Sequence, residues 1–124
     1  MKEDKPVQER RQSVRFRILS LVKHSTEPQG ASQVANIQNV SRGGLTFFTG
    51  QEIKEGVILQ LYFLPPNREK QVEARGKVVR CFPNGTPQKT FEIGIQFLDI
   101  SDEATRAILE LEAFFLKNQK KNEA

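Results

Sequence analysis

The feature that most constrains this 124-residue chain is a series of short runs in which apolar and polar residues alternate, with turn residues between the runs. The run "GVILQLYFL" at 56–64 is the clearest, because every second residue from Val57 is apolar and two prolines follow it. A period of two residues predicts a strand with one buried face, and the prolines predict where it ends. The runs "KQVEARGKVVR" at 70–80 and "TFEIGIQFL" at 90–98 repeat the pattern. These three runs therefore predict three strands in the second half of the chain.

The first half of the chain adds three more predicted strands. One runs from Phe16 to Lys23, has a partly apolar second face, and ends at the turn sequence "STEPQG". The segments "SQVANIQNV" and "LTFF" form two further strands around the glycine turn "SRGG" at 41–44. About six short strands at regular spacing predict a small antiparallel barrel or sandwich. Gly76, inside the fifth strand, lies where a bulge or a sharp bend is useful.

The period changes at the end of the chain, where apolar residues recur at helical spacing. Ser101 is suited to cap the N-terminus of a helix, and acidic residues follow it in the first turn. We expect this amphipathic helix to bury its apolar face against the barrel or a partner. The predicted apolar face consists of Ala104, Ala107, Ile108, Leu111, Phe114 and Phe115.

Composition limits the classes of function. The chain carries 19 Lys and Arg against 15 Asp and Glu, a formal net charge of +4, which suits an anionic partner. Its length fits one domain. Cys81 is the only cysteine, so an intramolecular disulfide is impossible and a reducing compartment fits best. No apolar run reaches the length of a signal peptide or a membrane span, so we expect a cytoplasmic protein without membrane insertion.

Catalytic and metal-binding patterns are sparse. His24, the only histidine, ends a strand-like run beside Lys23, and we expect it at the surface. One histidine and one cysteine give no indication of a nucleophile and its base, and no phosphate-binding glycine loop is present. An enzyme is therefore the least expected class of protein. We expect no catalytic residue, no bound metal and no cofactor.

Two polar motifs are not explained by the alternating pattern that predicts the core. Arg10, Arg11, Arg15 and Arg17 lie close together with no acid among them, and a solvated charge run is the simplest explanation of such a cluster. The segment "NVSRGG" at 39–44, taken by itself, reads as a plain hairpin turn, because glycine permits positive φ and close backbone approach. The two motifs gain weight from occurring together.

An RxxxR at Arg11 and Arg15 before the first strand, followed by [D/N]xSxxG at Asn39, Ser41 and Gly44, resembles the pattern of the PilZ domain family. The resemblance covers the chain from residue 10 to about residue 115. It implies a six-stranded antiparallel PilZ-type β-barrel with a C-terminal helix packed on it. Further segments similar to the family are "GKVVR" at 76–80, "GIQFLDIS" at 94–101 and the final helix.

The resemblance implies a receptor for cyclic di-GMP, which has two phosphodiester anions and two guanines. Arg11 and Arg15 would grip guanine O6 and N7 edges and phosphates, and Arg10 would join them. The chemistry agrees, because a planar guanidinium matches the paired acceptors of guanine and also stacks on a purine. An arginine just before RxxxR, as with Arg10, implies two cyclic di-GMP molecules per chain.

The resemblance also gives roles to residues beyond the arginine run. Asn39 would meet a guanine edge and Ser41 a phosphate or base, while Gly43 and Gly44 would keep the turn low enough for the base to approach. Asparagine has one acceptor oxygen where aspartate has two, so this departure bears on affinity. Arg80, at the end of the fifth strand, would add a contact. Arg42, inside the turn, is the weaker candidate, and we expect it to be solvent-exposed.

The expected organisation is a flexible tail over residues 1–9, a PilZ domain over 10–118 and a second flexible tail over 119–124. The expected function is a cyclic di-GMP receptor or adaptor that changes conformation and signals to an unidentified protein partner, as a monomer or weak dimer, without binding nucleic acid. Two alternatives are a ligand-independent PilZ-like interaction protein and a small barrel that binds single-stranded nucleic acid. The intact motifs argue against a ligand-independent protein. The phenylalanines fall at predicted core positions, which argues against stacking on single-stranded nucleic acid.

Overall fold

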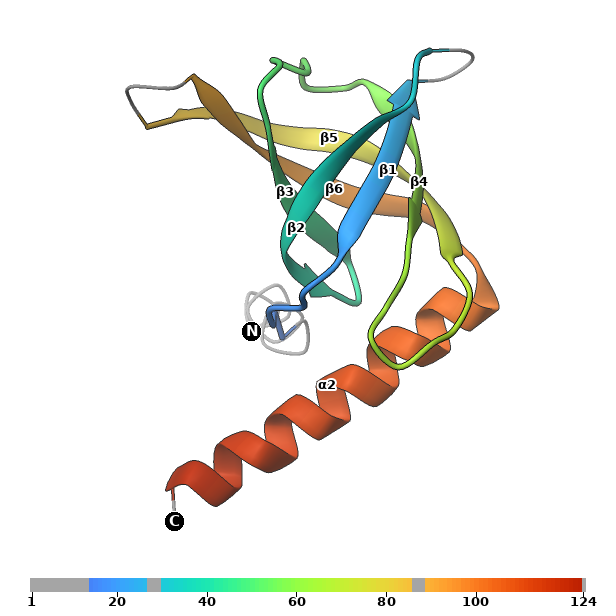
Figure 1. Cartoon of the computed structure of the whole chain (residues 1–124), viewed down its shortest axis with the longest axis vertical. Helices are drawn as coiled ribbons and strands as arrows, with labels where there is room; N and C mark the ends of the chain where they lie inside the picture. The colour runs from blue at the N-terminus through green and yellow to red at the C-terminus, as the bar shows by residue number, and fades with distance from the viewer. Residues whose placement is uncertain (1–13, 27–29, 86–88, 124) are drawn as a thin grey trace, which may run out of the picture.

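The computed structural model describes residues 14–26, 30–85 and 89–123. Within this part of the chain, six antiparallel strands close into a barrel in the order β1-β2-β3-β6-β5-β4, and helix α2 follows them (Figure 1). The predicted fold is confirmed. The elements are β1 Leu21–Thr26, β2 Gln33–Ser41, β3 Gly44–Thr49, β4 Ile58–Phe63, β5 Val72–Asn84, β6 Thr90–Ile100 and α2 Asp102–Glu123.

The barrel consists of two consecutive three-stranded meanders. Strands β1, β2 and β3 pair as neighbours along the chain, and so do β4, β5 and β6. Two long-range pairings join the meanders: β1 with β4, through Val22 and Phe63, and β3 with β6, through Gly44 and Gln96. We call these two pairings the seams. They leave no barrel strand with an unpaired edge.

The core fills the inside of the barrel with the apolar residues that alternate along each strand. In β4, Leu59, Leu61 and Phe63 are fully buried, as the sequence pattern predicts. Phe47 of β3 and Ile93 of β6 meet them from other strands of the closed sheet. Each such side chain contributes roughly 1.5–3 kcal/mol on burial, so the alternation itself specifies the barrel.

His24 is the clearest correction to the sequence analysis, because it is 4% exposed and not at the surface. It follows Val22 by two residues in β1, and therefore points into the barrel with it. Its ring stacks on that of Phe47, with the centroids 4.6 Å apart. Within the described residues its Nε2 has no hydrogen-bond partner, and burial lowers the pKa of the imidazole below its ordinary value.

The segment before β1 also departs from the prediction, because the strand begins at Leu21 instead of Phe16. Phe16 forms an isolated bridge with Val40 of β2, and its side chain is buried. Further along β5, the register shifts between Arg75 and Gly76, which confirms the predicted bulge. The chain thus reaches the barrel before its first regular strand starts.

Helix α2 covers one end of the barrel and then extends beyond it (Figure 1). The Ser101 hydroxyl accepts a hydrogen bond from the Ala104 amide at 3.1 Å, which confirms the predicted cap. Ala107 and Ile108 are buried as expected, whereas Phe114 is 64% exposed and does not belong to the buried face. The helix continues to Glu123.

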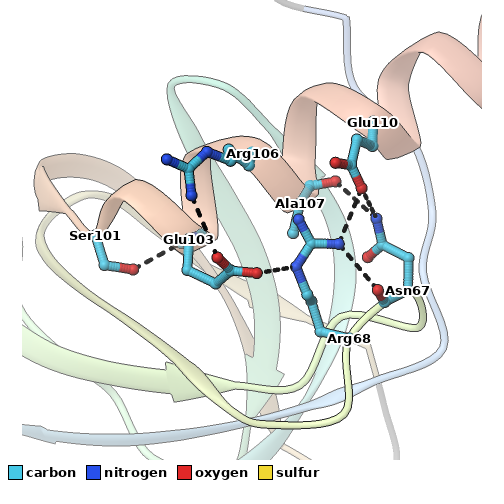
Figure 2. A network of polar contacts seen from close by, with 8 residues as sticks. Asn67, Arg68, Ser101, Glu103, Arg106, Ala107 and Glu110 are labelled. Atoms are coloured by element: carbon cyan, nitrogen blue, oxygen red, sulfur yellow. Dashed lines mark hydrogen bonds and ion pairs between the residues drawn. The ribbon is translucent and has the colours of Figure 1, made fainter.

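The loop between β4 and β5 fastens the first turns of α2 (Figure 2). Arg68 forms ion pairs with Glu103 and with Glu110, the latter at 2.9 Å. The side-chain amide of Asn67 donates to the backbone oxygen of Ala107 at 3.3 Å and to Glu110 at 3.1 Å. The hydrogen bond from Arg68 is the main cause that holds the pKa of Glu110 below its usual value. These contacts join the β4–β5 loop to the first turns of α2.

Candidate ligand-binding site

The two motifs meet through Arg15 and Asn39. Phe16 exchanges two backbone hydrogen bonds with Val40, at 3.0 and 2.8 Å, so Arg15 and Asn39, which each precede one of them, point to the face opposite to Phe16 and Val40. Arg15 Nη1 donates to Asn39 Oδ1 at 2.7 Å and to Thr46 Oγ1 at 3.1 Å. The structure therefore brings together an arginine of RxxxR and the asparagine of NxSxxG, which are 24 positions apart in sequence.

Ser41 holds the hairpin turn between β2 and β3. The residue is 4% exposed, and its hydroxyl accepts a hydrogen bond from the Gly43 amide at 3.2 Å. The same hydroxyl donates to the Gly44 carbonyl at 3.5 Å, a long contact. The hydroxyl of Ser41 therefore serves the backbone of its own turn, beside the Ser41–Gly44 pairing that closes the hairpin.

Gly44 lies on the seam between β3 and β6. A Cβ atom built on this residue would be 1.8 Å from the carbonyl oxygen of Ile95. Among the described residues, positive φ occurs only at Gly56 and Gly85, so neither glycine of the turn is there for a left-handed backbone. The absence of a side chain at Gly44 instead permits β3 to approach β6 closely, next to the Gly43 carbonyl that accepts from Phe97 at 2.8 Å.

The pairing registers place four residues in one row across four strands. Asn39 of β2 pairs with Thr46 of β3, Thr46 with Gly94 of β6, and Gly94 with Arg80 of β5. Direct cross-strand partners share one face of a sheet. Leu45, next to Thr46, points into the core, so this row lies on the outer face of the barrel. We call the row the strip.

Arg80 lies over Gly94, the strip residue without a side chain. A Cβ on Gly94 would be 3.0 Å from Cζ and from Nη2 of Arg80, so the guanidinium rests against the backbone. Its Cζ also lies 6.0 Å from the centroid of the Phe82 ring. Because Arg15 contacts the neighbouring Thr46, two guanidinium groups occupy adjacent positions of the strip. Such a pair suits a ligand with phosphates and planar bases.

The family model for the PilZ domain matches residues 9–114, which is most of the chain and includes the whole strip. The chain belongs to the PilZ domain family. A search of curated proteins found no match.

Solved structures give the same fold. The inhibitor of motility MotI/DgrA from Bacillus subtilis is 21% identical, with a TM-score of 0.71 over 91% of this chain and 53% of that chain. The MrkH–c-di-GMP complex from K. pneumonia is 14% identical, with a TM-score of 0.71 over 89% of this chain and 54% of that chain. The PilZ domain of YcgR from Escherichia coli, solved with c-di-GMP, is 12% identical, with a TM-score of 0.66 over 92% and 96%. This PilZ chain therefore spans about half the length of MotI/DgrA and of MrkH.

The remaining predicted residues of the PilZ site divide into two groups. Arg10 and Arg11 lie outside the described residues. Arg42 is solvent-exposed as expected, with 49% of its side chain exposed, and its guanidinium also pairs with Glu112 of α2. Glu112 and Gly94 were not among the predicted site residues, although Gly94 begins the segment "GIQFLDIS" that resembles the family. Glu112 could have been predicted to face the barrel, because it lies at helical spacing from Ile108 and Phe115 on the apolar face.

Other features of this PilZ domain lie apart from the strip. A hollow of about 710 Å³ lies between the β4–β5 loop and α2, and its lining includes Asn67, Arg68 and Glu103. Another hollow of about 230 Å³ lies beside His24. No group of three or more potential metal ligands occurs among the residues described. Within the same residues, no helix combines the length and the apolar character that crossing a membrane requires.

Proposed function

We propose that this PilZ domain is a cyclic di-GMP receptor without catalytic activity. The observation that carries the proposal is the strip, on which Arg15 and Arg80 contact adjacent positions beside Asn39. The c-di-GMP complexes of MrkH and of the YcgR PilZ domain, which share the fold, support the same ligand class. The ligand offers what two guanidinium groups bind best, namely anionic phosphates and the paired acceptors of guanine.

The proposal gives a specific task to each residue at or beside the strip. Arg15 turns from Asn39 and Thr46 toward a guanine edge or a phosphate, while Arg80 supplies a plane for stacking or a second charge-assisted contact. When Arg15 turns toward the ligand, Asn39 Oδ1 is released and can accept from the N1–H and N2–H edge of a guanine. Ser41 offers its hydroxyl, and the two glycines of the turn leave the approach open.

Arg10 and Arg11 complete the proposed site from the N-terminal side. We place both on guanine edges and phosphates, and we propose two cyclic di-GMP molecules per chain because Arg10 adds a cation against the doubled phosphate charge. Replacement of Arg10 by Leu should then shift the ratio toward one ligand while binding persists. A ratio of one for the unmodified protein, measured by calorimetry, would contradict the pair.

The proposed biological role is that of a cytoplasmic receptor or adaptor whose loaded state is passed to a protein partner, as a monomer or weak dimer. A ligand-independent interaction protein is the second candidate, and single-stranded nucleic acid is the third possible partner class. The strip favours the first role, because two guanidinium groups that contact adjacent strip positions match the phosphates and guanine edges of cyclic di-GMP.

Isothermal titration calorimetry tests the proposal, with cyclic di-GMP as the ligand and with GTP and a short single-stranded oligonucleotide as controls. We expect micromolar or tighter binding of cyclic di-GMP only. Arg15→Ala should weaken binding by about 10- to 100-fold, because a charge-assisted contact contributes roughly 1.5–3 kcal/mol. Arg17→Ala is the matched control, since Arg17 is an exposed arginine outside both motifs. Absence of heat with cyclic di-GMP, or equal binding of the oligonucleotide, would reject the proposal.

A further inference from the structure

Both motif segments contact the same turn of helix α2. Phe16, which follows Arg15, stacks on Phe115 with the ring centroids 5.9 Å apart and an angle of 26° between the planes. Arg42, which lies inside the NxSxxG turn, donates to Glu112 from Nε at 2.9 Å and from Nη2 at 3.4 Å. Two chain segments that are distant in sequence are thus held by one short stretch of helix.

Glu112 and Phe115 are three residues apart, so they lie on the same face of α2. Glu112 is unusual for a carboxylate, because its side chain is only 6% exposed. A buried carboxylate is stable only when it is paired and hydrogen-bonded, and Arg42 is the partner that the structure provides. The position of α2 and the position of the turn are therefore set together.

We infer that Glu112 and Phe115 are positioning residues for the ligand site, so that docking of this turn of α2 and ligand binding favour each other. The inference rests on the proposed function. Phe115 holds Phe16 and with it Arg15, whereas Glu112 holds Arg42 and with it the turn from Ser41 to Gly44. A docked helix removes in advance part of the ordering cost that both segments would otherwise incur when the ligand binds.

The sign of this linkage follows from the burial of Glu112. A ligand that drew Arg42 away would leave a buried carboxylate without its cation, which is costly. The bonds to Glu112 use Nε and Nη2, so the N–H groups of Nη1 remain to donate to an anion while the pair persists. Ligand binding is therefore expected to tighten the docking of α2 and not to release it. Linkage is reciprocal, so a change that loosens the docking of α2 must lower the affinity for the ligand by the same factor.

Phe115→Ala and Phe114→Ala form a matched pair for the test, because the two phenylalanines are adjacent on α2 but Phe114 is 64% exposed and Phe115 packs against the core. In the free protein, Phe115→Ala should speed hydrogen exchange at residues 14–18 and 40–46, and Phe114→Ala should not. Phe115→Ala should also weaken cyclic di-GMP binding about fivefold or more, and Phe115→Tyr should restore it.

Glu112→Gln provides an independent variant that keeps the size of the side chain, and it should weaken binding in the same direction. Exchange at the core amides of β4 reports whether each variant is folded. In the wild-type protein, cyclic di-GMP should slow exchange at residues 108–118.

Two results would overturn the inference: faster exchange at residues 108–118 on adding ligand, or identical behaviour of the Phe114 and Phe115 variants. If the wild-type protein bound no cyclic di-GMP, the proposed function and the linkage would both fail. Exchange in the free protein would then decide by itself whether α2 positions the two segments.

Discussion

Replacement of Gly44 by Ala tests the role of the β3–β6 seam. The new Cβ would start 1.8 Å from the Ile95 carbonyl oxygen, and real Cβ atoms essentially never come closer than 3.0 Å, so the backbone must move by about 1.2 Å. Rotation of a side chain cannot relieve a contact between Cβ and backbone. A shift of that size breaks or lengthens the seam hydrogen bonds on either side. With about two bonds affected at roughly 1–1.5 kcal/mol each, the expected loss of stability is about 3 kcal/mol.

Thermal unfolding followed by circular dichroism measures this loss. For a domain of this size about 3 kcal/mol corresponds to a fall in Tm of roughly 10 °C. Gly50→Ala is the control, because nothing lies within 4 Å of a Cβ at that position, and its Tm should stay within about 2 °C of wild type. If Gly44→Ala unfolded within about 2 °C of wild type as well, close strand approach would not be the reason for glycine at this position.

Three further variants test other parts of the molecule. Gly94→Ala, whose Cβ would be 3.0 Å from Cζ of Arg80, should leave Tm nearly unchanged but weaken cyclic di-GMP binding about fivefold or more in calorimetry; undiminished affinity would remove Arg80 from the site. Asn39→Asp should keep or tighten binding, because a carboxylate has two acceptor oxygens for the N1–H and N2–H groups of a guanine edge where an amide has one, and a loss above about tenfold in a folded variant would place residue 39 beside a phosphate. His24 has a pKa lowered by burial, so the folded state excludes a proton that the unfolded state takes up, and stability is fully present above pH 6.5 and falls as the pH falls below it. Urea unfolding between pH 7.5 and 5 should show this decline in the wild-type protein and a much flatter profile in His24→Leu; equal slopes would contradict it.

The strands and the helix were predictable because each has its own period. The alternation from Val57 to Phe63 and the helical spacing from Ala104 to Ile108 depend only on which face is buried, and burial is the largest favourable contribution to folding. His24 shows the limit of the same argument. Its polar side chain indicated a surface position, but it lies two residues after Val22 in β1 and so points to the same, inner face. The alternation of a strand decides this, because a single residue cannot change face without a bulge.

The strip was not predictable from spacing. The partners of Asn39 and Arg80 depend on which strands close the barrel and on two register shifts, between Ile37 and Asn39 and between Val78 and Arg80. A shift of one residue would turn Arg80 to the other face. Only the tertiary fold fixes this alignment, so the sequence indicated the members of the site more readily than their arrangement.

The two seams also determine when the strip comes into existence as the chain folds. Each meander consists of hairpins between neighbouring strands, which form quickly, whereas the seams join strands far apart in the chain and close slowly, on a timescale of milliseconds to seconds. Thr46 and Gly94 lie on opposite sides of the β3–β6 seam, so neither meander carries the strip by itself. A molecule bound at the strip therefore bridges both halves of the barrel, and it delays their separation more than it speeds their first encounter.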